Sequence, residues 1–230
     1  MSWFSSPALQ ESANRLSAVT TIKRQVTQLT RIVDDLLDVS RVTQGRIQLT
    51  RRAVDVATVI AHAVETVEPL LRAKQHRCSI IASCEPVYVH GDFARLVQCV
   101  GNILTNAAKY TESHGEIRVQ SRAEEATVVI EITDSGAGIS PQLLSRVFDL
   151  FVQGDRTIDR AQGGLGVGLA VVKRVVQMHG GEVTARSEGE GRGSTFELRL
   201  PRIERLQASP VDSTILERSL SGYSIHGTKS

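Results

Sequence analysis

The sequence predicts an α+β fold: a two-layer α/β sandwich in which a mixed sheet of about five strands is covered by three helices, with one long helix before it. Apolar residues recur three and four positions apart in residues 55–71, 92–109 and 165–179, which predicts three amphipathic helices. Alternating segments predict strands, two pairs of them hairpin-like. Helices combined with an antiparallel-rich sheet favour two packed layers. The expected strands are residues 77–82, 87–89, 116–122, 127–133, 182–187 and 194–200.

Composition allows a soluble enzyme and indicates no particular partner. A chain of 230 residues can hold one good-sized domain plus accessory segments. Twenty-seven Lys and Arg against 25 Asp and Glu leave a net charge of +2, too balanced to favour nucleic acid or an anionic membrane.

Cysteine usage and hydropathy bear on location. Cys78, Cys84 and Cys99 lack the paired spacing of zinc or redox sites, which fits a reducing cytoplasm. No stretch approaches the roughly 18 consecutive apolar residues of a membrane span. We therefore expect a cytoplasmic chain without membrane contact of its own, although its parent protein could be membrane-attached.

Residues 7–40 predict the long first helix. Ser5, Ser6 and Pro7 form a helix start. The apolar positions repeat at the spacing of a coiled coil or four-helix bundle, namely Val19, Ile22, Val26, Leu29, Val33 and Leu36. This stripe offers a surface for a homodimer, and a core helix of a single domain is the alternative. A break at residues 43–45 predicts a domain boundary, followed by a short strand at residues 47–49.

The helix at residues 92–109 carries a polar row. Asn102, Asn106 and Lys109 lie at i, i+4 and i+7, away from the apolar face. Asparagine is a poor helix former, so two on one stripe call for a reason. A carboxamide oxygen suits Mg²⁺, and the lysine suits a phosphate. A solvated helix face remains the alternative.

Two glycine-rich segments point to a flat, phosphorylated ligand. Asp134 ends a buried strand and precedes Gly136 and Gly138, which let the backbone approach a ring closely. Residues 163–169 open a helix with unobstructed N–H groups that suit phosphate oxygens. They match neither a P-loop nor a dinucleotide fingerprint. Ordinary turns and a flexible hinge are the alternatives.

These segments together resemble the conserved boxes of sensor histidine kinases. Five boxes occur in the family's order within residues 46–201: the asparagine box at residues 102–111, the first glycine box at 134–138, the phenylalanine box at 148–151, the second glycine box at 163–169 and the last glycine box at 191–196. Residues 31–41 are also similar to the end of the family's second dimerisation helix.

The resemblance implies an ATP-binding catalytic domain that uses ATP and Mg²⁺. Asn106 would hold the metal, Lys109 would meet the phosphates, Tyr110 would pack near the adenine, and Asp134 would bind its amino group. Residues 153–163 would form a mobile lid. The implied nucleotide-binding set is Asn102, Asn106, Lys109, Tyr110, Asp134, Gly136, Gly138, Ile139, Phe151, Gly164, Leu165, Gly166, Val167, Gly168, Leu169 and Thr195.

The same resemblance divides the chain into three parts. Residues 1–45 would be a partial dimerisation and phosphoacceptor region containing the second helix only, residues 46–203 the ATP-binding domain, and residues 204–230 a linker or disordered tail. The phosphoacceptor motif is absent, so no catalytic histidine is assigned. The six histidines are His62, His76, His90, His114, His179 and His226.

The predicted function is that of a histidine protein kinase in two-component signal transduction or a phosphorelay, phosphorylating a histidine only in trans. Expected partners are a histidine-bearing dimerisation helix and a response regulator receiver domain, the latter joined to the same chain in a hybrid kinase. Related gyrase-type and heat-shock ATPases carry a glutamate base where this chain has Asn102, which favours kinase over ATPase. A nucleotide-gated binding module and a slow ATPase remain open.

Overall fold

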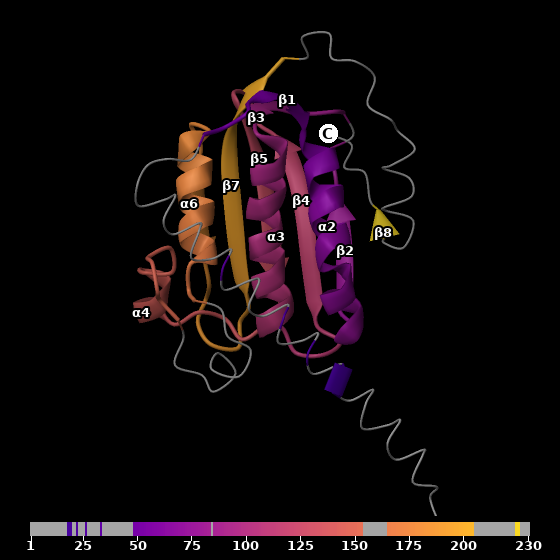
Figure 1. Ribbon diagram of the computed structural model, residues 1–230, viewed down its shortest axis with the longest axis vertical. Coiled ribbons are helices and arrows are strands. Elements are labelled where there is room, and N and C mark those ends of the chain that lie inside the picture. Colours follow the sequence, from indigo (N-terminus) through magenta and orange to yellow (C-terminus); the bar gives the residue numbers. More distant parts are fainter. Residues whose placement is uncertain are drawn as a thin grey trace, which may run out of the picture.

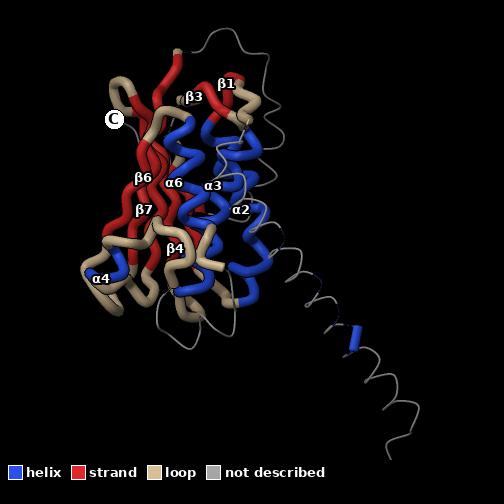
Figure 2. Tube along the Cα trace, turned by 60° about the vertical axis from the view of Figure 1, so that its left-hand side comes forward, coloured by secondary structure: helices blue, strands red, loops and turns tan. Residues whose placement is uncertain are grey.

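The computed structural model describes residues 48–83, 85–153, 165–204 and 224–225, together with the single residues Ala18, Val19, Ile22, Val26 and Val33. Within this part, the strands join one eight-stranded sheet, and the three long helices lie on one of its faces (Figures 1 and 2). The predicted two-layer α+β sandwich is confirmed. Five strands behind three helices form its body, and three short strands extend the sheet.

The described helices are α2 (Val56–Ala73), α3 (Phe93–Tyr110), α4 (Pro141–Leu144) and α6 (Gly168–Met178). The strands are β1 (Arg52–Asp55), β2 (Arg77–Ile81), β3 (Tyr88–Gly91), β4 (Glu116–Ala123), β5 (Thr127–Asp134), β6 (Glu182–Arg186), β7 (Ser194–Ile203) and β8 (Ser224–Ile225). Their order is β1-β3-β7-β5-β4-β2-β8, with β6 also paired to β7. Strand β2 runs parallel to β4 and β8, and the other pairs are antiparallel.

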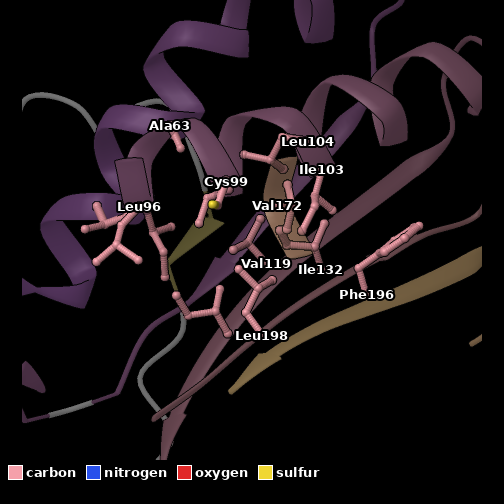
Figure 3. Close-up of a cluster of buried hydrophobic side chains, with 14 of the residues drawn as sticks. Ala63, Leu96, Cys99, Ile103, Leu104, Val119, Ile132, Val172, Phe196 and Leu198 are labelled. Carbon is pink, nitrogen blue, oxygen red and sulfur yellow. The ribbon is translucent and has the colours of Figure 1, made fainter. Parts of the chain in front are cut away.

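The core lies between the helices and the inner face of the sheet (Figure 3). Ile103 and Leu104 of α3, Ile132 of β5, Val172 of α6 and Leu198 of β7 are all fully buried there. Capping fixes where α3 begins, because the side chain of Asp92 accepts from the N–H of Arg95 at 3.1 Å. The apolar stripe of α3 therefore faces the sheet, and its polar row is left for other contacts.

Among the described residues, ion pairs and no helix lie on the outer face of the sheet. The carboxylate of Glu197 on β7 is only 3% exposed. It accepts hydrogen bonds from Arg122 of β4, Arg186 of β6 and Arg199 of β7. Burial by itself would raise the pKa of Glu197, but the hydrogen bonds from Arg122 and Arg199 lower it below its ordinary value. This polar layer explains why one sheet face needs no further element.

Some element boundaries differ from the sequence prediction. Residues 48–50 form no strand, and the strand begins at Arg52 because its register with β3 brings Val54 opposite Val89, both buried. Strand β7 continues beyond Leu200 to Ile203, where it changes partner to β3. Helix α6 begins at Gly168 rather than Leu165.

Two further elements were not predicted. The one-turn helix α4 is capped by Ser140, whose hydroxyl accepts from the N–H of Leu143. Within the expected tail, Ser224 and Ile225 pair with Ser79 and Ile80 at the edge of the sheet.

The described residues of the first helix are helical and exposed. Val19, Ile22, Val26 and Val33 are 52–61% exposed. The rest of the predicted helix at residues 7–40 lies outside the described residues, as does most of the expected lid. In the part of the chain that the structure describes, no helix has the length and apolar character needed to cross a membrane.

Candidate functional site

The polar row of α3 lies beside the start of α6. Asn102, Asn106 and Lys109 are half-buried, and the side-chain amide of Asn102 donates to the backbone oxygen of Gly168 at 3.3 Å. This contact joins the middle of α3 to the first turn of α6. The side chain of Asn106 makes no hydrogen bond with any other described residue, so its carboxamide oxygen can bind a ligand.

Lys109 and Tyr110 form a local pair at the end of α3. The Lys109 ammonium donates to the Tyr110 hydroxyl at 2.9 Å and lies 4.6 Å from the centre of its ring. Both side chains are half-buried. A cation is thus held at the end of the helix, one turn beyond Asn106.

Asp134 is a buried carboxylate at the end of β5. It is 7% exposed; one oxygen accepts from the N–H of Gly136 at 2.8 Å, and the other accepts from the hydroxyl of Ser194 at 2.5 Å. Burial raises its pKa above the ordinary value, and these two hydrogen bonds oppose that effect. The backbone N–H of Ser194 also opposes this rise in pKa. An ionised carboxylate has about four acceptor sites, so Asp134 can still accept from a ligand donor.

The turn after Asp134 has no room for side chains. A Cβ on Gly136 would lie 2.7 Å from the oxygen of Tyr110 and 2.8 Å from Asp134. Gly138 has a φ of +68°, and a Cβ there would lie 1.9 Å from the oxygen of Gly189. Both glycines are therefore required by the packing as well as by the proposed approach of a ring.

The turn is braced by the loop between β6 and β7. The N–H of Gly191 donates to Ala137 at 2.7 Å, and the N–H of Gly193 donates to Gly136 at 3.1 Å. Ile139, half-buried against the core, donates its N–H to the hydroxyl of Ser187 at 3.0 Å. The first and last glycine segments thus form one interlocked unit.

The second glycine segment leads directly into α6. Gly166 has a φ of +72°, which a helical residue does not adopt, and its oxygen accepts from the N–H of Phe151 at 3.0 Å. Leu165, Gly168 and Leu169 are half-buried and Val167 is buried. The N-cap residue Val167 has no polar side chain to bond the first N–H groups of α6, and within the described residues these groups can bind an anion. Gly164 lies outside the described residues.

The phenylalanine segment has one inward and one outward ring. Phe148 packs edge-on against Phe196, with ring centres 6.3 Å apart. Phe151 is 61% exposed and has a φ of +64°. The structure therefore places Phe151 next to the second glycine segment through its backbone and leaves its ring exposed.

The side chain of Thr195 points away from Asp134. Its hydroxyl lies 3.1 Å from that of Thr133, on the outer face of the sheet, because neighbouring strand residues point to opposite faces. The register pairs Asp134 with Ser194. Ser194, whose hydroxyl donates to Asp134, is therefore a further candidate, and the role of Thr195 stays a prediction. Strand alternation contained this signal, since Phe196 and Leu198 point inward and share their face with Ser194.

A separate cleft of about 590 Å³ lies on the α2 side of Asp134. Its lining includes His76, Arg77, Glu116 and Asp134 but no residue of α3 or α6. The candidate site is thus distinct from this cleft and shares one carboxylate with it. Within the described residues, no three His, Cys, Asp or Glu side chains are grouped to bind a metal by themselves.

Comparison with known proteins identifies this arrangement. The family described as histidine kinase-, DNA gyrase B-, and HSP90-like ATPase matches residues 91–204, which run from the start of α3 past the end of β7. Sensor histidine kinase TrcS of Mycobacterium tuberculosis is 35% identical over 195 residues, covering 82% of this chain and 37% of that protein. The chain belongs to the sensor histidine kinase family. Its matched region is the ATP-binding catalytic domain.

Further relatives agree. Hybrid signal transduction histidine kinase D of Dictyostelium discoideum is 30% identical over 217 residues, covering 80% of this chain and 14% of that kinase. The solved structure of full-length ShkA in complex with AMPPNP matches with a TM-score of 0.71 and 27% identity, covering 87% of this chain and 41% of ShkA. The chain thus spans between 14% and 41% of the length of these relatives.

Proposed function

We propose that the chain binds Mg²⁺-ATP between α3 and α6 and transfers the γ-phosphate to a histidine supplied by another helical segment. The observation that carries this proposal is the meeting of a buried carboxylate, Asp134, with two side-chain-free turns beside the amide row of α3. This arrangement offers a carboxylate that can accept a hydrogen bond from a base and backbone N–H groups that can bind phosphates.

The adenine would be read by Asp134. An exocyclic amino group can donate to the carboxylate, whereas the keto oxygen of guanine cannot, and Ser194 and Gly136 hold the carboxylate oxygens in place. Ile139 and Tyr110 would supply apolar contact on either side.

The phosphates would lie at the start of α6. Its uncapped N–H groups and the positive end of its dipole favour phosphate oxygens. Asn106 would hold Mg²⁺ together with phosphate oxygens, because its amide is free and Mg²⁺ takes few protein ligands. The bound ion would neutralise charge on the triphosphate. Lys109, one turn further along α3, would turn from Tyr110 towards a phosphate.

Transfer to histidine suits this set of groups. A neutral imidazole nitrogen attacks the γ-phosphorus, the bond to the β-phosphate oxygen breaks, and ADP leaves with the bonding electrons. Attack by water would instead require a base, and α3 presents the amide of Asn102 where a carboxylate would be needed. Asn102 is also engaged with Gly168. The proposed partners are a histidine-bearing helix and a receiver domain that accepts the phosphoryl group.

The test compares the hydroxyl groups of Ser194 and Thr195, which lie on opposite faces of the sheet. Calorimetry should detect Mg²⁺-dependent ATP binding; Ser194→Ala should weaken it about tenfold, the equivalent of one hydrogen bond to a charged group. Thr195→Ala should change the ATP affinity less than twofold.

A second experiment tests phosphate transfer. Incubation of the chain with radiolabelled ATP and a separate helical hairpin that bears the histidine should give an acid-labile phosphorylated hairpin. ATP binding without transfer would reduce the chain to a binding module, and no binding would sink the proposal.

A further inference from the structure

The turn between α2 and β2 holds the last turn of α3 by its backbone. The Lys74 ammonium donates to the oxygen of Lys109 at 2.7 Å and to that of Thr111 at 2.9 Å. Nε2 of His76 lies 3.2 Å from the oxygen of Thr111 and 3.1 Å from that of Glu112. Carbonyl oxygens only accept, so Nε2 carries the hydrogen.

These contacts satisfy the carbonyl groups that a helix leaves unpaired at its end. In residues 109–112, Tyr110 is the exception: its oxygen accepts instead from the N–H of Ala137 at 3.0 Å, in the turn that follows Asp134. The carbonyl groups at the end of α3 therefore accept hydrogen bonds from two different turns. The α2–β2 turn holds it on one side, and the turn proposed to face adenine holds it on the other.

Charge adds to this arrangement. The C-terminal end of a helix carries partial negative charge, which a nearby ammonium stabilises. Lys74 is half-buried; that burial lowers its pKa, and Glu112 opposes the effect. Lys74 is 35 residues from Lys109 in sequence, so this is a tertiary contact and not a local cap.

We propose that Lys74 is a positioning residue of the nucleotide site, resting on the proposed function above. Its two hydrogen bonds fix where Tyr110 lies, and Tyr110 in turn fixes Ala137, Gly136 and Asp134 through the Tyr110–Ala137 bond. Without the ammonium, the carbonyl of Lys109 turns to water, that of Thr111 keeps only His76 as a side-chain donor, and the last turn of α3 frays. The adenine-facing turn then loses its support.

The experiment compares three lysine variants. Lys74→Met removes the charge and the donors but keeps the apolar stem, Lys74→Arg keeps charge and donors, and Lys173→Met removes an exposed lysine from α6 as the control. Lys74→Met should weaken ATP and ADP binding equally, by at least tenfold, because the affected contact serves the adenosine half. Lys74→Arg should stay within threefold of the original affinity, and Lys173→Met should not change it.

A local readout separates positioning from general stability. In nucleotide-free protein, at a temperature where circular dichroism shows each variant folded, Lys74→Met should speed hydrogen exchange of the Ala137 amide at least fivefold. The Val129 amide in the middle of β5 should be unaffected. Unchanged Ala137 exchange, or unchanged affinity in folded Lys74→Met, overturns the proposal. Absence of ATP binding by the original chain would contradict the proposed function instead, and Ala137 exchange would still decide the structural role of Lys74.

Discussion

Two apolar helical stripes in this chain have opposite surroundings. Ile103 and Val100 of α3 are at most 1% exposed, because the stripe lies on the inner face of the sheet. Ile22 and Val26 of the first helix have the same spacing but are 61% and 56% exposed. Periodicity therefore predicts that a helix has an apolar face, but not which surface covers it. The sheet and its three helices complete a core without the first stripe.

The largest expected difference comes from the same change made in both stripes. Ile103→Ala should lower the free energy of unfolding by about 2 to 5 kcal/mol, through lost burial and the cavity left behind. Ile22→Ala should lower it by less than about 0.5 kcal/mol, as surface substitutions do. Urea unfolding followed by circular dichroism measures both. Equal losses would show that Ile22 is buried in solution and would break the comparison.

A second difference concerns pH, because α3 is also fixed at its start. Nε2 of His179, at the end of α6, accepts from the N–H of Asp92 at 2.9 Å, and Nδ1 lies 2.7 Å from the oxygen of Val175. Accepting through Nε2 requires a neutral ring. Burial lowers the pKa of His179 below its ordinary value of 6.5; Arg51 and His90 add to this, and the Val175 hydrogen bond and Asp92 oppose it.

The unfolded chain therefore binds the proton of His179 more readily than the folded one. Stability should be complete above about pH 6.5 and should fall as pH drops below it, by up to about 1.4 kcal/mol per pH unit. Unfolding curves between pH 5.5 and 7.5 measure this slope. His179→Gln should reduce the slope, whereas Ile22→Ala should leave it unchanged. An equal slope in His179→Gln would assign the effect to other groups.

The smallest expected effect is that of removing the exposed stripe altogether. We propose residues 46–203 as an autonomous ATP-binding domain, so deletion of residues 1–45 should change ATP affinity less than twofold. The unfolding midpoint of the domain should also stay within experimental error. Sedimentation of both chains would show whether residues 7–40 form a homodimer. A large loss of affinity on deletion would mean that the first helix contributes to the site.

Local signals predicted most elements of the fold. Asp92 marks the start of α3 to within one residue, because its side chain caps the first turn. The strand expected at residues 47–49 was wrong, since pairing with β3 decides where β1 lies. The prolonged β7 passes through Pro201, where a sequence pattern suggests an end, and continues because β3 offers a new partner.

The candidate site was predictable where its residues lie on one element. The row of Asn102 and Asn106 follows from helix geometry, and Asp134 follows from a strand end before glycines. Ser194 is not among the predicted site residues, although strand alternation places its side chain on the same face as Phe196 and that of Thr195 on the opposite face. No local sequence pattern predicts the role of Lys74, because its carbonyl partners lie on the following helix and in the turn after it. Every residue has a backbone carbonyl, so the residue types at these positions do not reveal the contact.

The interlocked glycine loops also determine where the domain can accept extra sequence. A longer β6–β7 connection would push Gly189 and Gly193 out of register with residues 136–138, because backbone touches backbone there. The β4–β5 hairpin is different: Glu125 and Ala126 are exposed and make no contact with the candidate site. A peptide tag or reporter module inserted between Glu125 and Ala126 should leave nucleotide binding intact.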